Sequence, residues 1–549
     1  MVFRNSDEIL GRRADRRRIV KVATGAAAAF CATGVLGKSY QRALAQDSVK
    51  DQILKIPGAN KQPSDSDMEK VGELCLKTQN KDKFKGQTVT FIGLNNTGFH
   101  NNIFRPLSKP WEEATGAKIS WIDVPQAEVF SKVQQGVASG TVEFDVLEGG
   151  APWEGDILGK GLALEMPDSV KQQIEIDDYV KYLQPPVGTW DGKTYRVSID
   201  GDAHNLNYRA DVFSDKDLAD QWKNSGGEGD WGVPTTWQQV QAYTKFLKGT
   251  KTNGLDNYGI IDVCKTGGGF SWYFFASRAT AYVKHPDDKA WLFDAETMKP
   301  RINNPGFVRA AQDVIDALPS EPADQLNADL LKTLGQFLAG TGTICHWWGD
   351  IGSNVYTNSQ SVFIGNDKLK AGFSILPGSP DVFNSKTGKW DTIQGNNFAP
   401  NDAYLGWGLY VMNESTKRGV SDAAWDLAAH LGGKDLSLWM ACYPSGFQPY
   451  RTSHFDVKDW VATGYPEDFA TAYLKSESDS YNHPNAAIEP RIPGIFQYYV
   501  AAEEELAKAF AGEKSAQDAL DTVAGQWEQT TDQLGRDNQI KLYQAALGL

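Results

Sequence analysis

Short apolar runs alternate with amphipathic stretches between residues 88 and 147. The runs at 88–93, 118–122 and 144–147 are rich in Val, Ile and Phe and predict buried strands. Helical periodicity at about 106–115 and 126–138 separates these runs. Because strands that alternate with helices pair in parallel, the pattern predicts an α/β domain built on a parallel sheet.

The rest of the chain adds a hairpin and several helices. An Asp-Gly pair in 190–195 predicts a hairpin tip, followed by extended segments at 196–200 and 206–209. A threonine before an amphipathic run predicts a capped helix that ends near Leu247. Further helical stretches lie at 68–77, inside a polar segment at 46–83, and at 516–530 and 534–547.

Two loops that follow predicted strands carry candidate ligand-binding residues. In open parallel sheets, ligands lie beyond the carboxyl ends of the strands. The loops at 93–102 and 148–154 are rich in glycine, amides and aromatic rings. We select Asn95, Asn96 and Trp153 as candidates, although the glycines of these loops are equally consistent with simple tight turns.

Length and charge narrow the class of protein. A chain of 549 residues is too long for one ordinary domain, so two or more lobes are expected. Residues 1–45 hold nine Lys or Arg and three Asp or Glu, which leaves a net charge of −20 on the remainder, against −14 for the whole sequence. Such a polyanion does not favour nucleic acid or anionic lipid as a partner. The 17 tryptophans exceed what is usual, and they allow an aromatic-lined ligand site besides a packed core.

The first 45 residues have the features of an export signal. Residues 15–21 (DRRRIVK) match the twin-arginine pattern, and a weakly apolar Ala- and Gly-rich run follows to residue 37. The ALA sequence at 43–45 predicts cleavage after Ala45 and a periplasmic mature protein. A basic helix that stays on the mature chain is the alternative. A lipid anchor on Cys31 is rejected, because Phe30 stands where a small residue is needed.

Four cysteines remain after this cleavage: Cys75, Cys264, Cys345 and Cys442. In an oxidising compartment we expect one or two structural disulfides, and three pairings are open. The sequence has no CxxC pair, so it indicates neither a zinc site nor a thioredoxin-type redox site.

Several ordered segments resemble the extracellular solute-binding proteins of ABC importers, in the group that includes maltose-binding proteins. They are WEEATG at 111–116, FDV at 144–146, DGKTY at 191–195, NYRADVF at 207–213, PTTW at 234–237, GWGLYV at 406–411, the helix at 423–431, SGFQPY at 445–450 and the C-terminal helices. Each segment is common by itself, and their order carries the resemblance over about residues 84–545.

The resemblance implies a two-lobe α/β fold of the periplasmic-binding-protein type II kind, with a ligand cleft between lobes that close by hinge bending. The implied parts are the signal peptide at 1–45, an extension at 46–83, lobe 1 at 84–199 with a return segment at about 400–442, and lobe 2 at 200–399 with a helical part at about 443–549. Hinges are expected near 199–202, within 376–403 and near 443–448. The implied partners are a small solute and the permease subunits of the inner membrane, and the implied state is a monomer.

A sugar or polyol is the predicted ligand, because carboxylates and amides can bind its hydroxyls while aromatic rings cover its C–H faces. The expected site residues beyond Asn95, Asn96 and Trp153 are Asp200, Asp202, His204, Asn205, Phe270, Ser271, Trp272, Tyr273, Trp347, Trp348, Asp350, Trp407 and Arg451. The segment at 346–351 resembles the family's ligand-facing tryptophan stretch. Core packing is the alternative for each aromatic ring and turn capping for Asp200 and Asp202. His346, beside the tryptophans, is expected to be a hydrogen-bonded structural residue.

Enzymatic functions find less support in the sequence. It contains no P-loop, HExxH or GxSxG motif, and its seven histidines form no metal-ligand pair on a helix, so no cofactor is predicted. An exported glycoside hydrolase that uses Asp200 and Asp202 is the main alternative. A redox enzyme is a third alternative, because the twin-arginine route often exports cofactor-containing proteins.

Overall fold

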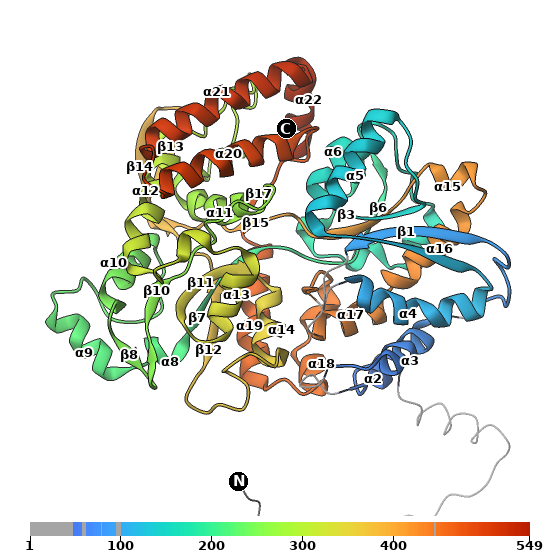
Figure 1. Cartoon of the computed structure of the whole chain (residues 1–549), viewed down its shortest axis with the longest axis horizontal. Helices are drawn as coiled ribbons and strands as arrows, with labels where there is room; N and C mark the ends of the chain where they lie inside the picture. Colours follow the sequence, from blue (N-terminus) through green and yellow to red (C-terminus); the bar gives the residue numbers. More distant parts are fainter. Residues whose placement is uncertain (1–47, 58–61, 78, 95–99, 444–445) are drawn as a thin grey trace, which may run out of the picture. The chain divides into compact units, whose positions relative to one another are not determined.

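A five-stranded sheet forms the core of the first lobe in the computed structural model (Figure 1). Its order is β2-β1-β3-β16-β6, with β1–β2 and β1–β3 parallel and β16 antiparallel to both neighbours. The bounds are β1 Thr88–Leu94, β2 Lys118–Val124, β3 Val146–Gly150, β6 Arg196–Ser198 and β16 Trp407–Val411. The three predicted parallel strands are confirmed, although β3 begins two residues later than expected. The structure describes residues 48–57, 62–77, 79–94, 100–443 and 446–549, and Val49–Leu549 form one unit.

Helices of the first lobe follow the predicted alternation. They are α4 His100–Thr115, α5 Gln126–Ser139, α6 Glu154–Ile157, α7 Asp168–Gln173, α15 Glu414–Lys417, α16 Ser421–Leu431 and α17 Lys434–Cys442. Helix α4 begins six residues before the predicted start and continues through Pro106 and Pro110. The predicted hairpin is formed by β4 Thr189–Trp190 and β5 Lys193–Thr194, and both of its tip residues, Asp191 and Gly192, have positive φ, as a two-residue turn requires.

A four-stranded sheet forms the core of the second lobe, with the order β10-β11-β7-β12. Its strands are β7 His204–Arg209, β10 Tyr258–Ile260, β11 Gly342–Trp348 and β12 Ala371–Ile375. Its helices include α8 Ala210–Phe213, α9 Lys216–Asn224, α10 Trp237–Leu247, α11 Ser271–Val283, α12 Pro305–Ala317, α13 Leu330–Leu338 and α14 Asp350–Thr357. The predicted capped helix is α10, where Thr236 and Gln239 form a capping box.

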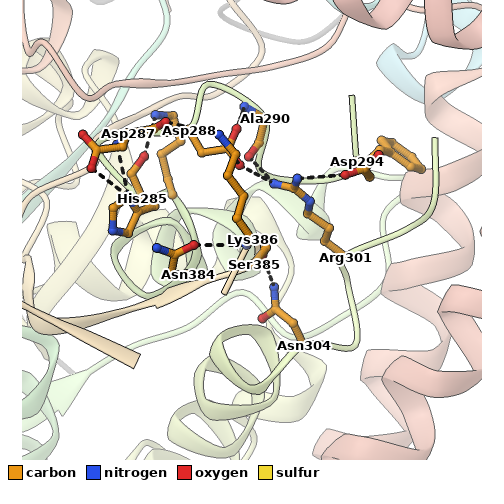
Figure 2. Close-up of polar contacts among 12 residues, drawn as sticks. His285, Asp287, Asp288, Ala290, Asp294, Arg301, Asn304, Asn384, Ser385 and Lys386 are labelled. Carbon is orange, nitrogen blue, oxygen red and sulfur yellow. Dashed lines mark hydrogen bonds and ion pairs between the residues drawn. The ribbon is translucent and has the colours of Figure 1, made fainter. Parts of the chain in front are cut away.

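The hairpin of β13 Ser379–Asn384 and β14 Lys389–Asn397 is fixed to this lobe by polar contacts at its turn (Figure 2). Asn304 donates a hydrogen bond to the Ser385 hydroxyl at 3.4 Å, and Lys386 lies 3.7 Å from the Asp288 carboxylate. Arg301 joins the same group through Asp288 at 3.0 Å. These charges pair with one another, so they are not available to bind a charged ligand.

Five helices form the C-terminal part of the chain. They are α18 Val457–Ala462, α19 Glu467–Tyr481, α20 Ile495–Phe510, α21 Ala516–Leu534 and α22 Arg536–Leu547. All but α18 pack mainly on the second lobe. Helix α19 packs on β12 and β7, while α20 and α21 pack on α12 (Figure 1). The last two helices confirm the helical periodicity of the sequence, and none of the helices in the described part of the chain is long and apolar enough to cross a membrane.

The extension folds as two helices on the first lobe, α2 Val49–Ile53 and α3 Asp65–Cys75. Gly72 of α3 lies so close to α4 that a Cβ there would be 2.4 Å from the Leu107 carbonyl oxygen. Lys50 forms an ion pair with Asp459 at 2.9 Å, and Trp439 donates to the Ile56 carbonyl at 2.6 Å. The short helix predicted at 68–77 is therefore confirmed, with a start three residues earlier.

The expectation of structural disulfides is wrong for the described residues. Cys75, Cys264, Cys345 and Cys442 are all free thiols. Cys345 lies inside β11 and Cys442 ends α17 in the other lobe, so elements that do not pair hold them apart. Burial raises the pKa of all four thiols, which keeps them protonated and weakly reactive.

Candidate functional site

The candidate residues converge where three chain segments cross between the two sheets. The first crossing lies between β6 and β7, the second between β12 and β16, and the third follows α17. Residues 199–203 of the first crossing and 399–406 of the second are buried, with Asp200 1% and Asp402 0% exposed. Side chains from both lobes therefore meet at this boundary and not on an open surface.

Aromatic rings from both lobes surround Tyr404 at this boundary. Trp407 and Trp153 of lobe 1 lie 4.8 Å and 6.3 Å from the Tyr404 ring, measured between ring centroids. Phe270 and Tyr273 of lobe 2 lie 5.5 Å and 5.8 Å from the same ring. We call these five residues the aromatic group. Such rings offer flat apolar faces of the kind that pack against the C–H face of a sugar.

The backbone at Tyr404 is held in an uncommon conformation. Tyr404, Leu405 and Gly406 have φ values of 76°, 54° and 75°, so two side-chain-bearing residues occupy the left-handed region in succession. Each such residue costs roughly 1–2 kcal/mol. The tyrosine ring lies directly over Gly150, where a Cβ would come within 2.2 Å of Cζ. The sequence thus combines a strained turn and a glycine at the end of β3 to place this ring between the lobes.

A cluster of acidic side chains lies next to the aromatic group. Gln448 connects its members: its backbone N–H donates to Asp200 at 2.6 Å, its side-chain amide donates to Asp202 at 2.5 Å, and its amide oxygen accepts from the backbone N–H of Gly349. On lobe 2, the Glu477 carboxylate accepts from Asn205 at 2.6 Å. One side chain thus bridges the first crossing, the third crossing and the start of α14.

Two further acids extend this cluster toward α20. Asp402 lies in β15 Asn401–Asp402, which pairs with β17 Ala487–Ile488, and Glu489 follows that strand. Tyr499 donates a hydrogen bond to Glu489. Neither oxygen of Asp402 has a hydrogen-bond partner among the described residues, and the hydroxyls of Tyr273 and Tyr404 have none either. Buried polar atoms without partners are rare in folded proteins, and they mark a place where a polar ligand can bind.

Burial dominates the protonation of these acids. It raises the pKa of Asp350 to about 7 and those of Asp202, Glu477 and Glu489 to about 8. Burial also raises the pKa values of Asp200 and Asp402 well above the usual range, and repulsion from Asp202 and from Glu489, respectively, is the second cause. Burial lowers the pKa of His204, so that this imidazole is neutral.

Comparison with known protein families identifies the family of this chain. The family model described as bacterial extracellular solute-binding protein matches residues 107–467. The chain belongs to this family. No curated protein matches in sequence.

Solved structures show that this solute-binding protein has the two-lobe fold of the family. An ABC transporter solute-binding protein from Agrobacterium radiobacter, in complex with ribitol, aligns with a TM-score of 0.62 at 18% identity and covers 81% of this chain and 99% of its own. One from Agrobacterium vitis with bound D-mannitol aligns with a TM-score of 0.61 at 19% identity and covers 82% of this chain and 99% of its own. Maltose-bound MalE3 of T. maritima aligns with a TM-score of 0.61 at 18% identity and covers 81% of this chain and 100% of its own. At this level of identity the likeness establishes the fold.

Eight of the sixteen predicted site residues of this solute-binding protein lie at the boundary. The structure brings together Trp153, Asp200, Asp202, Phe270, Tyr273, Trp348, Asp350 and Trp407. Of the adjacent tryptophans, Trp348 donates to the Ala403 carbonyl in the second crossing at 3.1 Å, whereas Trp347 donates to Asp350. His346 forms the predicted structural hydrogen bond, with the Phe274 carbonyl at 3.0 Å.

Other predicted residues are not part of this group. Trp272 stacks on Tyr499 and lies against Trp527, toward the C-terminal helices. Arg451 is saturated within lobe 1, where its guanidinium donates to the Gly432 and Glu175 carbonyls at 2.7 Å and 3.2 Å. His204 hydrogen-bonds Ser277 at 2.7 Å and contacts Trp348, which places it behind the rings. Asn95 and Asn96 lie outside the described residues.

Sequence reasoning missed Asp402, Tyr404, Gln448, Glu477 and Glu489. Glu477 and Glu489 are single polar residues in segments that carry no recognised motif, whereas Gln448 lies in the SGFQPY segment, which the resemblance includes without naming a ligand-binding residue in it. A weak signal for Asp402 and Tyr404 existed, since NDAYLGWG at 401–408 ends in the strand that returns to lobe 1. Within the described part of the chain, no group of three or more His, Cys, Asp or Glu has the geometry to hold a metal ion. A small pocket of about 90 Å³ lies elsewhere, between the extension and lobe 1, and is lined in part by Cys75 and His430.

Proposed function

We propose that this protein captures a sugar or polyol between its two lobes and delivers it to the permease of an ABC importer. The family supplies the role of a solute-binding protein, and the ribitol, mannitol and maltose complexes among its structural neighbours support this class of ligand. We further propose export by the twin-arginine route with cleavage after Ala45, periplasmic action as a monomer, and the lobe limits given by the resemblance.

One observation supports this ligand class most strongly. Aromatic faces from both lobes and hydrogen-bonding atoms without partners occur together at the boundary, in Tyr273, Asp402 and Tyr404. A sugar or polyol combines apolar C–H faces with a ring of hydroxyls, and its burial requires both kinds of contact.

The test is a thermal-shift screen on the mature chain from Gln46, unfolded and refolded to remove bound solute. A sugar or polyol present at about a thousandfold its Kd is expected to stabilise the protein by roughly 4 kcal/mol. Recovery of the unchanged solute afterwards supports binding without turnover. Recovery of a cleaved sugar would instead place the protein among glycoside hydrolases, and stabilisation by phosphorylated or anionic solutes alone would contradict the proposed ligand class.

A further inference from the structure

The boundary between the lobes holds an excess of buried acid. The acids concerned, which we call the boundary acids, are Asp200, Asp202, Asp350, Asp402, Glu477 and Glu489. Each is at most 7% exposed, and no ion pair within the described residues includes any of them. Because a buried carboxylate without a cation is costly, this arrangement needs either protons or a cationic partner.

The neighbouring cations do not supply this partner. Arg196 and Arg491 share Glu154, at 3.7 Å and 3.3 Å. Arg196 also donates to Ser198 and to the Leu405 carbonyl, and its charge acts only as a minor influence on Asp202, where it lowers the pKa. His204 is neutral because burial lowers its pKa. Two arginines share one glutamate, so the net charge of this group is a single positive charge, and it faces six acids.

A second, independent feature points to a ligand beside these acids. The hydroxyls of Tyr273 and Tyr404 are buried and have no hydrogen-bond partner among the described residues. Both carboxylate oxygens of Asp402 are likewise buried and without a partner there. Burial raises the pKa of both hydroxyls. Asp202 raises it in addition for both tyrosines, and Glu489 does so for Tyr273, so these acids lie within electrostatic reach of the hydroxyls. Polar atoms without partners and unpaired acids are therefore next to each other.

The aromatic group completes a site with a definite chemical preference. The ring centroids of Tyr404 and Trp407 lie 4.8 Å apart, and the Tyr404 ring lies within electrostatic reach of Asp202. An ammonium group is attracted by aromatic faces as well as by carboxylates. A neutral hydroxyl is attracted less strongly than an ammonium group, both by aromatic faces and by carboxylates.

We propose that the solute is a sugar or polyol that carries an ammonium group, with Asp402 and Glu489 as its carboxylate partners. This inference rests on the proposed function, since it specifies the ligand of the same site. The hydroxyls of the solute would bind Tyr273, Tyr404 and Gln448, and its ammonium group would replace the protons that the buried acids otherwise hold.

A matched pair of solutes tests the proposal: 1-amino-1-deoxyglucitol against glucitol, by isothermal titration calorimetry at about pH 7.5. The two differ in one group, and a primary alkylamine stays protonated at this pH. The amine is expected to bind roughly 10- to 100-fold more tightly, the range of a hydrogen bond to a buried charge. Glucosamine with glucose, and galactosamine with galactose, extend the comparison to rings.

Variants identify the group that gives this preference. Asp402→Asn and Glu489→Gln are expected to reduce the preference for the amine by at least about tenfold each. Asp381→Asn, on the β13–β14 hairpin, makes the same change of net charge and should leave the preference as it is. The two variants in the site are independent, so failure of one to fold, judged by circular dichroism, leaves the other as a test.

Two results would overturn the proposal, and they differ in what else they affect. If glucitol or glucose binds as tightly as its amine, the preference is absent while sugar or polyol capture stands. If no member of the pairs and no other sugar or polyol binds, the proposed function fails and this inference fails with it. An amine preference that persists in both Asp402→Asn and Glu489→Gln would place the ammonium group elsewhere and contradict the assigned partners.

Discussion

Gly150→Ala is expected to abolish solute binding and to destabilise the protein by about 2 kcal/mol or more. The added Cβ would lie 2.2 Å from Cζ of Tyr404 and 2.3 Å from its hydroxyl oxygen. The tyrosine cannot move aside easily, because the left-handed backbone of Tyr404 and Leu405 fixes its direction. Gly150 itself has a φ of −80°, which alanine accepts, so the effect is steric. Thermal unfolding and calorimetric titration of a bound solute measure the two losses.

Gly335→Ala is the matched control for this substitution. Gly335 lies inside α13, and a methyl group added there would have no heavy atom within 4 Å, so alanine should be neutral or slightly stabilising. Normal solute affinity in Gly150→Ala would show that the Tyr404 ring is not part of the binding site.

The sequence predicted the elements that periodicity and capping specify. The strands at β1 and β2 and the helix α10 fall within a few residues of their expected positions, because buried strands and a Thr236 cap leave local signals. Helix α4 was predicted too short, since Pro106 and Pro110 are normally expected near the beginning of a helix. The disulfide prediction failed for another reason: cysteine count and compartment say nothing about which elements lie side by side.

The stability of the ligand-free protein is expected to fall between about pH 7 and pH 8.5. In the folded state Asp202, Glu477 and Glu489 have pKa values of about 8, whereas the unfolded chain has lost these protons above about pH 5. The folded state therefore binds more protons than the unfolded state, and stability decreases as pH rises toward 8. The summed loss over this window should be roughly 3 kcal/mol or more, since one pKa unit corresponds to about 1.4 kcal/mol.

Buried histidines change the stability in the opposite direction, and they do so at lower pH than these acids. Burial lowers the pKa values of His204, His346 and His430, so their contribution to stability is lost as pH falls below about 6.5. The urea midpoint at several pH values measures the effect. Glu489→Gln should flatten the decrease above pH 7. A midpoint that is constant or rises over this range would mean that these acids are ionised in the folded protein.

The candidate site was predicted only where chemistry and position coincide in the sequence. Trp153, Asp200 and Trp407 lie beside strand ends and crossing segments, which a strand pattern can locate. Gln448, Glu477 and Glu489 reach the same place from distant parts of the chain: Gln448 lies in the third crossing, Glu477 is brought there by the packing of α19, and Glu489 follows β17. Arg451 has the right chemistry for a ligand, but its donors are used by backbone carbonyls of lobe 1.

The central claim is that the solute binds between the two lobes. Calorimetric titration of a solute that the protein binds, into one variant from each lobe, tests it most directly. Trp153→Ala removes a ring from lobe 1 and Tyr273→Phe removes a hydroxyl from lobe 2, while Trp272→Phe is a control whose ring lies against Tyr499 and Trp527. Binding between the lobes predicts one site per chain, at least about tenfold weaker binding in each of the first two variants, and little change in the third. Unchanged affinity in both Trp153→Ala and Tyr273→Phe would contradict it, because the solute would then bind outside the boundary between the lobes.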